Sequence, residues 1–155
     1  MPEVGDKAPD FSLYDADKKI RRLNEFLVKG KKIIVAFFPG AFTSACTQEM
    51  CSFRDMYSEL ESMRGGVVGI SVDAPFAQKA FAEKNSLTFP LLCDFKREVV
   101  PKYGVTWNNL SGVEGYISAN RAIFVLNDNG IITYKWVAPS PGTLPDFNEI
   151  KNALC

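Results

Sequence analysis

The chain has 155 residues, of which 46% are hydrophobic and 23% are charged. This composition is typical of a globular protein, and we expect residues 1–155 to form a single domain with its own core. Lys plus Arg and Asp plus Glu number 18 each, so the charge gives no reason to expect nucleic acid or an anionic membrane as a partner. No apolar run approaches the roughly 20 residues of a transmembrane helix, and the N-terminus lacks the pattern of a signal peptide. We therefore expect a cytoplasmic location.

The chain contains no histidine and four cysteines, Cys46, Cys51, Cys93 and Cys155. The lack of histidine excludes Cys-His dyads, Ser-His-Asp triads and histidine metal ligands. In a reducing compartment such cysteines are more often catalytic, redox-active or simply buried than joined in structural disulfides. No Cys-x-x-Cys pair occurs, which makes zinc a weak alternative.

The N-terminal part of the chain predicts a hairpin, a short helix and a buried strand. Residues 11–14 and 19–23 alternate with a period close to two on either side of a polar turn, as hairpin strands do. Asn24 is a suitable cap for a short helix that ends near Gly30. Residues 32–38 are almost continuously apolar, which is typical of a strand covered on both faces.

Residues 43–64 have the period of an amphipathic helix, and Gly65-Gly66 is expected to terminate it. The apolar positions recur at steps of four and three residues: Cys46, Met50, Phe53, Tyr57 and Leu60. A strand over 67–72 follows. A second helix is then expected to start at Pro75, to bury Phe76, Ala80 and Phe81, and to end near Asn85.

The C-terminal half completes an alternating pattern of strands and helices. A short strand (90–93), an irregular helix (95–103, with Pro101 inside) and a loop (104–120) come first. Residues 122–126 and 131–137 flank an Asn-Gly turn and predict a hairpin. Thr143 to Asp146 resembles a capping box with Pro145 near N1, opening a helix that buries Phe147, Ile150 and Leu154. This order predicts an α/β thioredoxin-like fold, with a mixed central sheet flanked by helices and an N-terminal β-hairpin extension.

Residues 39–51 join the apolar strand to the long helix and place Cys46 in the first turn of that helix. Cysteine attacks as its thiolate, and a free thiol with a pKa of about 8.5 is mostly protonated at neutral pH. The free N–H groups of a helix N-terminus favour the anion, and further help must come from a distant Arg or Lys. Thr43, as N-cap, places a hydroxyl nearby that can accept a hydrogen bond from a peroxide, while Pro39 shapes the mouth of the loop. The plainer alternatives are an ordinary N-cap and a small buried cysteine.

The pattern Pro39-x-x-x-Thr43-x-x-Cys46 matches the whole active-site motif of the peroxiredoxin family, which the chain resembles over nearly its full length. Five other segments carry the resemblance: 5–13, 69–73, 89–94, 103–105 and 120–130. The resemblance implies that Cys46 is the peroxidatic cysteine, which attacks ROOH to give a sulfenic acid. It also implies that Thr43 and the Cys46 backbone bind the peroxide oxygens.

The same resemblance assigns roles to two charged residues. Arg121 occupies the position of the family's arginine and would stabilise the thiolate and the transition state. The alternative for Arg121 is a solvated residue at a strand end. Glu49 matches a position that is often acidic or an amide in the family, and it either orients the arginine or lies on the helix surface.

Cys51 lies five residues after Cys46, which in an intact helix is a net rotation of about 140° and a rise of about 7.5 Å. A disulfide needs Cα atoms within about 6.8 Å and converging Cβ vectors. The two cysteines can therefore bond only if the start of the helix unwinds, which would make the pair a switch.

The Cys46–Cys51 spacing resembles that of peroxiredoxin Q, also called the bacterioferritin comigratory type. This implies that Cys51 resolves the sulfenic acid as an intramolecular disulfide, which a thioredoxin-like or glutaredoxin-like protein then reduces. The loop with Gly40 and Phe42 instead resembles single-cysteine and atypical two-cysteine relatives. Cys155 is the rival resolving cysteine, within a chain or between chains, and Cys93 is expected to be a small core residue.

The sequence thus predicts a thiol-dependent peroxidase for hydrogen peroxide and small organic hydroperoxides, acting without metal, haem or flavin. A thioredoxin-like disulfide oxidoreductase is a second possibility, disfavoured by the missing Cys-x-x-Cys. A peroxide sensor or holdase chaperone that uses the same cysteine is a third. Either a monomer or a homodimer is compatible with the sequence, since Phe42 and Trp107 are loop aromatics that could face a partner.

Overall fold

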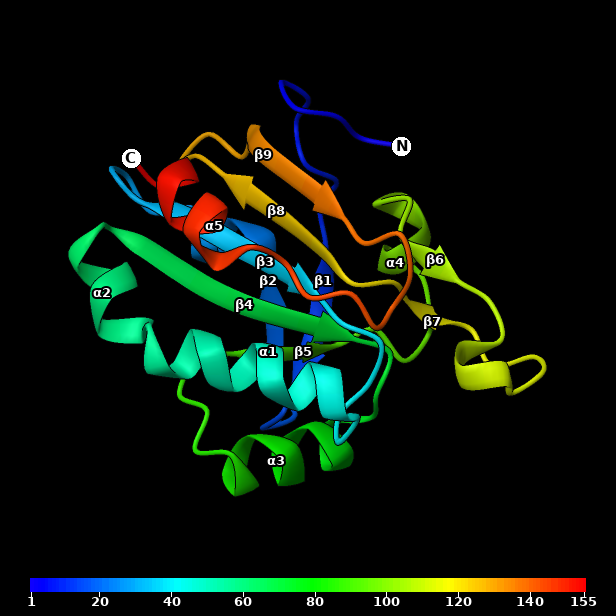
Figure 1. Cartoon of the computed structure of the whole chain (residues 1–155). Helices are drawn as coiled ribbons and strands as arrows, with labels where there is room; N and C mark the ends of the chain where they lie inside the picture. Colours follow the sequence, from blue (N-terminus) through cyan, green and yellow to red (C-terminus); the bar gives the residue numbers. More distant parts are fainter.

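A seven-stranded mixed sheet forms the centre of the computed structural model, which describes residues 1–155 (Figure 1). The strand order is β2-β1-β5-β4-β3-β8-β9. Strands β3, β4 and β5 run parallel, while β1, β8 and β9 each run antiparallel to a neighbour. The strands are β1 (Ser12–Asp15), β2 (Ile20–Arg22), β3 (Lys32–Phe37), β4 (Gly65–Ser71), β5 (Leu91–Cys93), β8 (Ala122–Leu126) and β9 (Ile132–Val137). This is the mixed sheet that the sequence predicts, including the N-terminal hairpin.

Helices cover both faces of the sheet. They are α1 (Ser44–Asp55), α2 (Tyr57–Ser62), α3 (Pro75–Lys84), α4 (Val99–Lys102) and α5 (Phe147–Ala153), with 3-10 turns η1 (Leu23–Phe26) and η2 (Leu110–Gly112). One hydrophobic cluster joins α1, α2, α3 and α5 to one face, and a second joins the N-terminal segment, η1 and α4 to the other. None of these helices has both the length and the apolar character needed to span a membrane.

Strand β3 lies between the two clusters, which explains its continuous apolar sequence. Ile33, Val35 and Phe37 point into one cluster, whereas Ile34 and Ala36 point into the other. Because successive side chains of a strand alternate between faces, a strand covered on both sides must be apolar at every position. The strand predicted over 32–38 is confirmed.

One edge of the sheet brings together segments that are far apart in the sequence. The chain leaves the carboxyl end of β3 to enter α1, and the carboxyl end of the parallel strand β4 lies beside it. Strand β8 runs antiparallel to β3, with Ala122 opposite Phe37, so β8 starts where β3 ends. Arg121, directly before β8, is therefore delivered to the start of α1.

The long helix expected over 43–64 is divided at Met56, where α1 ends and α2 begins. Gly65-Gly66 does not terminate it, because both residues belong to β4 and Arg64 adopts the left-handed conformation, with φ of 57°. A Cβ atom on Gly65 would lie 2.7 Å from the Leu154 side chain of the α5 end. That glycine is needed for close packing rather than for the helix end.

The buried face of α3 also differs from the prediction. Phe76 is 74% exposed and Ala80 is exposed, whereas Gln78 and Phe81 are buried. The Gln78 amide donates to the Ser71 hydroxyl at 2.9 Å and to a backbone carbonyl of β5 at 3.0 Å. A buried polar side chain is tolerated when it is hydrogen-bonded, and hydropathy alone does not reveal such partners.

Two predicted helix caps are wrong. Asn24 lies inside η1, whose N-cap is Arg22, and the Glu25 carboxylate accepts the Arg22 N–H at 2.9 Å. At the last helix, Asp146 rather than Thr143 is the N-cap, so Pro145 precedes the cap. Aspartate caps a helix well because its carboxylate accepts the unpaired N–H groups of the first turn.

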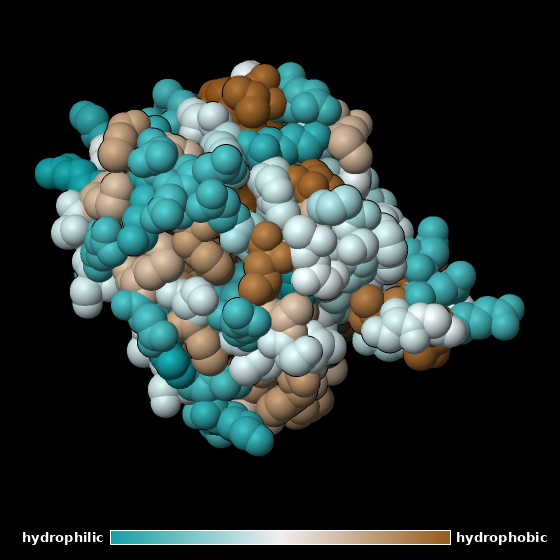
Figure 2. All heavy atoms as spheres, in the orientation of Figure 1, coloured by the Kyte–Doolittle hydropathy of each residue, from teal (hydrophilic) through white to brown (hydrophobic).

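The segment 104–120 is mostly loop, as expected, but also holds the strands β6 (Thr106–Trp107) and β7 (Ser118–Ala119), which pair with each other. Figure 2 shows the region around η2 standing out from the body of the molecule. Its exposed side chains include Val113, Tyr116 and Ile117.

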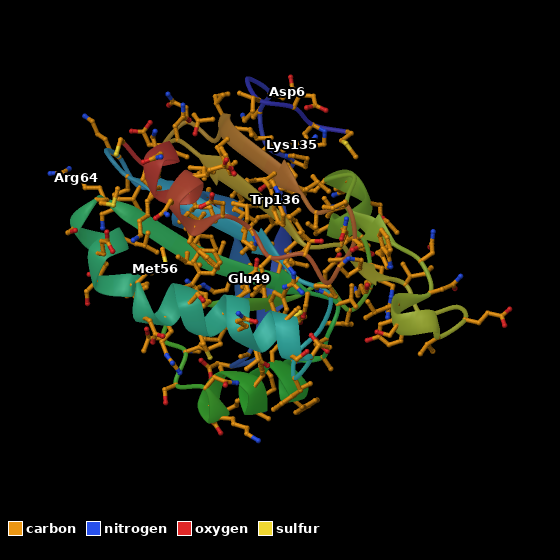
Figure 3. All side chains as sticks on the ribbon, viewed as in Figure 1. Asp6, Glu49, Met56, Arg64, Lys135 and Trp136 are labelled. Carbon is orange, nitrogen blue, oxygen red and sulfur yellow. The ribbon has the colours of Figure 1, made fainter.

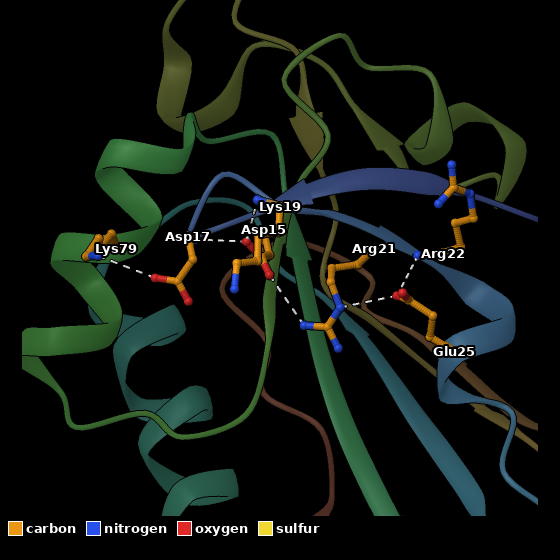
Figure 4. Close-up of polar contacts among 7 residues, drawn as sticks. All are labelled: Asp15, Asp17, Lys19, Arg21, Arg22, Glu25 and Lys79. Atoms are coloured by element: carbon orange, nitrogen blue, oxygen red, sulfur yellow. Dashed lines mark hydrogen bonds and ion pairs between the residues drawn. The ribbon is translucent and has the colours of Figure 1, made fainter.

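Ion pairs lie within the N-terminal hairpin and between it and α3 (Figure 4). Asp15 accepts a hydrogen bond from Arg21 at 3.3 Å across the hairpin, and Asp17 pairs with Lys79 of α3 at 3.3 Å. A hollow of about 460 Å³ lies between this hairpin, α3 and β5, and Cys46 does not line it.

Candidate active site

Cys46 is the third residue of α1, and Thr43 occupies the N-cap position, as predicted. The first backbone hydrogen bond of the helix is Thr47 N–H to the Thr43 carbonyl, at 2.9 Å. The Cys46 N–H therefore has no acceptor within the helix, and no side chain caps this end. Cys46 is 0% exposed, so its sulfur lies in a closed environment at the positive end of the helix dipole.

Arg121, which directly precedes β8, contacts Cys46 at the start of α1. Its Nη2 lies 3.2 Å from the Cys46 Sγ, and its Nη1 donates to the Glu49 carboxylate at 2.9 Å. Nε and Nη2 both donate to the backbone carbonyl of Pro141, at 3.0 and 2.8 Å. Arg121 is only 1% exposed, so the solvated alternative is wrong. These four hydrogen bonds fix the guanidinium and leave one of its five N–H groups free.

Glu49 is fully buried on the side of α1 that faces the sheet (Figure 3). The alternative prediction, that Glu49 lies on the helix surface, is therefore wrong. Burial raises the pKa of Glu49 to about 7, although Arg121 partly offsets this effect. One carboxylate oxygen, Oε2, has no hydrogen-bond partner. The charge on this side chain thus changes near neutral pH.

The pKa of Arg121 shows the opposite balance. Burial lowers it, but Glu49 and the Cys46 thiolate more than offset that effect, and the net pKa is raised. The reason for the difference is that Arg121 has several acceptors around it, whereas Glu49 has a single donor. Arg121 therefore remains a cation whatever the state of Glu49.

Thr43 is oriented by the loop that precedes α1. Its hydroxyl donates to the Gly40 carbonyl at 2.9 Å and makes no hydrogen bond to the helix. Because the hydrogen is used in this way, the oxygen lone pairs of Thr43 are available to accept a hydrogen bond. Pro39 is buried at the start of the same loop.

Asp73 holds this loop in place, a role that the sequence analysis missed. Its Oδ2 accepts the Ala41 N–H at 2.8 Å and the Ser71 hydroxyl at 2.6 Å. Phe42 adopts a positive φ of 67°, and its ring meets Phe81 edge-on at 5.4 Å.

The position of Asp73 just after β4, beside the end of β3, was an available signal for its role in the site. The Pro141 carbonyl, also missed, carries no sequence signal because every residue has one.

Cys51 lies on another side of the intact α1, away from Arg121. Its Sγ is 3.6 Å from the Asn85 Oδ1 at the end of α3, and the residue is half-buried. All four cysteines are free thiols. The Cys46–Cys51 disulfide therefore stays a prediction, and it requires the helix to open.

The other two cysteines are remote from this chemistry. Leu154 packs against Gly65 at the start of β4, so the exposed Cys155 lies at the amino ends of the parallel strands. Cys46 follows their carboxyl ends, about 20 Å away for a six-residue strand. Cys93 is buried in β5, where burial, Asp73 and Asp15 raise its pKa to about 12. It is a core residue, as predicted.

The fold and this arrangement define a thioredoxin-like protein with a cysteine and an arginine buried together at a helix N-terminus. Comparison with known proteins identifies the family to which the chain belongs. Residues 4–135 match the model of the AhpC/TSA family. The chain is 37% identical over 134 residues to "Putative peroxiredoxin bcp" of Coxiella burnetii, covering 86% of this chain and 87% of that protein.

Two further relatives agree with this match. "Peroxiredoxin Q, chloroplastic" of Populus jackii is 37% identical over 128 residues, which cover 83% of this chain and 57% of that protein. The crystal structure of peroxidoxin BcpB from Mycobacterium tuberculosis superposes with a TM-score of 0.83 at 30% identity, covering 99% and 95% of the two chains. The chain belongs to the AhpC/TSA family of peroxiredoxins and is a peroxidase.

Proposed function

We propose that this peroxiredoxin reduces hydrogen peroxide and small organic hydroperoxides with Cys46 as the attacking thiolate. The observation that carries the proposal is the 3.2 Å contact between Arg121 Nη2 and the Cys46 Sγ, inside a closed site at a helix N-terminus. A charge-assisted hydrogen bond in such a site is stronger than one in water. It supports a thiolate and aims a fixed cation at the reacting atoms.

In the first step the Cys46 sulfur attacks one peroxide oxygen, the O–O bond breaks, and RO⁻ leaves and takes up a proton to form ROH. Cys46 becomes a sulfenic acid. The donors suited to the peroxide oxygens are the unpaired Cys46 N–H and the free N–H of Arg121, and the Thr43 oxygen is a suitable acceptor. The two donors can stabilise developing negative charge without having to move, which is an effective way to lower a barrier.

In the second step Cys51 attacks the Cys46 sulfenic acid to give a disulfide and water. Oxidation itself supports the opening of α1 that this requires, because a sulfenic acid is neutral. The attraction between an anionic Cys46 sulfur and the Arg121 cation is then weakened, and with it part of what holds the first turn. A thioredoxin-like or glutaredoxin-like dithiol protein completes the cycle by reducing the disulfide.

The test is steady-state consumption of peroxide with a thioredoxin and its reductase. We expect Cys46→Ser to abolish turnover and wild type to form a Cys46–Cys51 linkage that peptide mapping detects. Turnover retained in Cys46→Ser would refute the mechanism. Oxidation of wild type without turnover would instead favour a peroxide sensor, and mapping of Cys46 to Cys155 would reject Cys51 as the resolving residue.

A further inference from the structure

The side of α1 that carries Cys51 is attached to the end of α3 through one residue, Asn85. The Asn85 Nδ2 donates to the Phe81 carbonyl at 3.0 Å, which turns its Oδ1 toward α1. The Cys51 Sγ lies 3.6 Å from that Oδ1, within the range of a thiol hydrogen bond. The backbone carbonyl of Asn85 accepts a hydrogen bond from Arg54 Nη1 at 2.7 Å.

The two attachments act on one side of α1, because Cys51 and Arg54 are three residues apart. They are also close in space, since both side chains contact Asn85. Asn85 thus contacts the thiol directly and anchors the helix one turn further along.

We propose that Asn85 is a positioning residue for the second step of the reaction, holding the Cys51 thiol against α3 and so setting the rate at which the sulfenic acid becomes a disulfide. This inference rests on the proposed function, in which Cys51 is the resolving cysteine. In that step Cys51 loses its proton and its sulfur attacks the Cys46 sulfur. The new S–S bond forms as the S–O bond breaks, and the departing hydroxide and the proton make water, so no other oxidant or reductant is consumed.

The position of Arg54 would confine the opening to the start of α1. The Arg54 contact lies after Cys51 in the chain, so it holds the last turn of α1 while the earlier turns unwind. The Cys51 contact is a bond between a neutral thiol and an amide, which is weak, and it breaks first. The Asn85 side chain therefore sets how easily Cys51 leaves, and the Asn85 carbonyl limits how far the helix opens.

The experiment compares Asn85→Ala, Asn85→Asp and the control Asn152→Ala, whose residue is exposed on α5. Reduced protein is mixed with hydrogen peroxide, quenched with acid at intervals and mapped by mass spectrometry for disulfide and for sulfinic acid at Cys46. We expect Asn85→Ala to form the disulfide faster by about 3- to 10-fold, because one weak hydrogen bond is removed. Sulfinic acid should fall in proportion, with the rate of Cys46 oxidation unchanged.

Asn85→Asp keeps an acceptor and the size of the side chain but loses the Nδ2 donor to the Phe81 carbonyl, and it covers the case in which the alanine variant does not fold. Its carboxylate strengthens the attraction of Arg54 and disfavours a Cys51 thiolate, so we expect slower disulfide formation and more sulfinic acid than in wild type. Asn152→Ala should match wild type.

Equal rates of disulfide formation in wild type and both Asn85 variants would overturn this inference while leaving Cys51 as the resolving residue. A slower oxidation of Cys46 in Asn85→Ala would also overturn it, by assigning Asn85 to the first step. Absence of any Cys46–Cys51 disulfide in wild type would refute the proposed role of Cys51, and this inference with it.

Discussion

The two sides of α1 hold its two cysteines, Cys46 and Cys51, in different ways. Cys46 faces a cation that is itself fixed by Glu49 and Pro141, and Cys46, Arg121 and Glu49 are all buried. Cys51 faces a neutral amide at 3.6 Å and is only half-buried. Charge-assisted hydrogen bonds are roughly twice as strong as neutral ones. Cys46 is therefore held tightly by Arg121, whereas Cys51 is held loosely by Asn85. One helix can therefore combine a preformed, buried site with a thiol that can be released.

The largest expected effect comes from removing the cation on the Cys46 side. We expect Arg121→Gln to slow Cys46 oxidation by hydrogen peroxide by about 10²- to 10³-fold, the usual effect of losing one such donor. It should also lower the free energy of unfolding by about 3–5 kcal/mol, because Glu49 loses its only buried partner. Stopped-flow oxidation and urea denaturation measure the two effects.

The exposed Arg22 offers a matched control for this change. Arg22→Gln should leave both quantities close to wild type. An oxidation rate within threefold of wild type in Arg121→Gln would show that Cys46 does not depend on the buried cation, and the contrast between the two sides would then fail.

The next effect is a pH dependence that originates in Glu49. Its pKa is raised by burial from 4.5 to about 7, so the folded state binds the proton more tightly than the unfolded state. The resulting stability is fully present below about pH 4.5 and is lost as the pH rises through about 7. Wild type should therefore lose a few kcal/mol of stability, relative to Glu49→Gln, between pH 5 and pH 8.

Urea denaturation of wild type and Glu49→Gln at several pH values checks this expectation. Parallel stability curves for the two proteins would show that Glu49 does not titrate in this range. The Asp6→Asn variant, which alters an exposed carboxylate, serves as the control and should retain the wild-type curve.

A smaller effect is expected from the loop that precedes Cys46. Asp73→Asn weakens the acceptor for the Ala41 N–H and for the Ser71 hydroxyl. Since a hydrogen bond to a charged group contributes about 1.5–3 kcal/mol, we expect the loop to loosen and Cys46 oxidation to slow by roughly tenfold. The formation of the disulfide from the sulfenic acid should be unaffected, because Asp73 does not contact Cys51. A defect confined to that second step would contradict the separation of the two sides.

The smallest effect is expected at Cys155, which lies at the far end of the sheet from Cys46. Cys155→Ser should leave steady-state turnover with thioredoxin unchanged, at both low and high protein concentration. A loss of turnover that grows with protein concentration would instead indicate resolution between chains.

The sequence alone determined the features that depend on neighbouring residues. The apolar run at 32–38 could only be a strand covered on both faces, and Thr43 before Cys46 could be recognised as a helix start. The Asn-Gly turn before β9 was likewise readable, since Gly130 takes a φ of 77° there. Such features follow from backbone preferences and hydrophobic period, which act over a few residues.

The features that depend on distant partners follow from tertiary contacts alone. Gln78 replaced Phe76 in the core because its amide found acceptors on β4 and β5, and Gly65 proved to be a packing contact with Leu154. Arg121 reaches Cys46 because β8 runs antiparallel to β3, which places residues 75 positions apart side by side. Strand pairing and buried hydrogen bonds are long-range choices, so no local pattern encodes them.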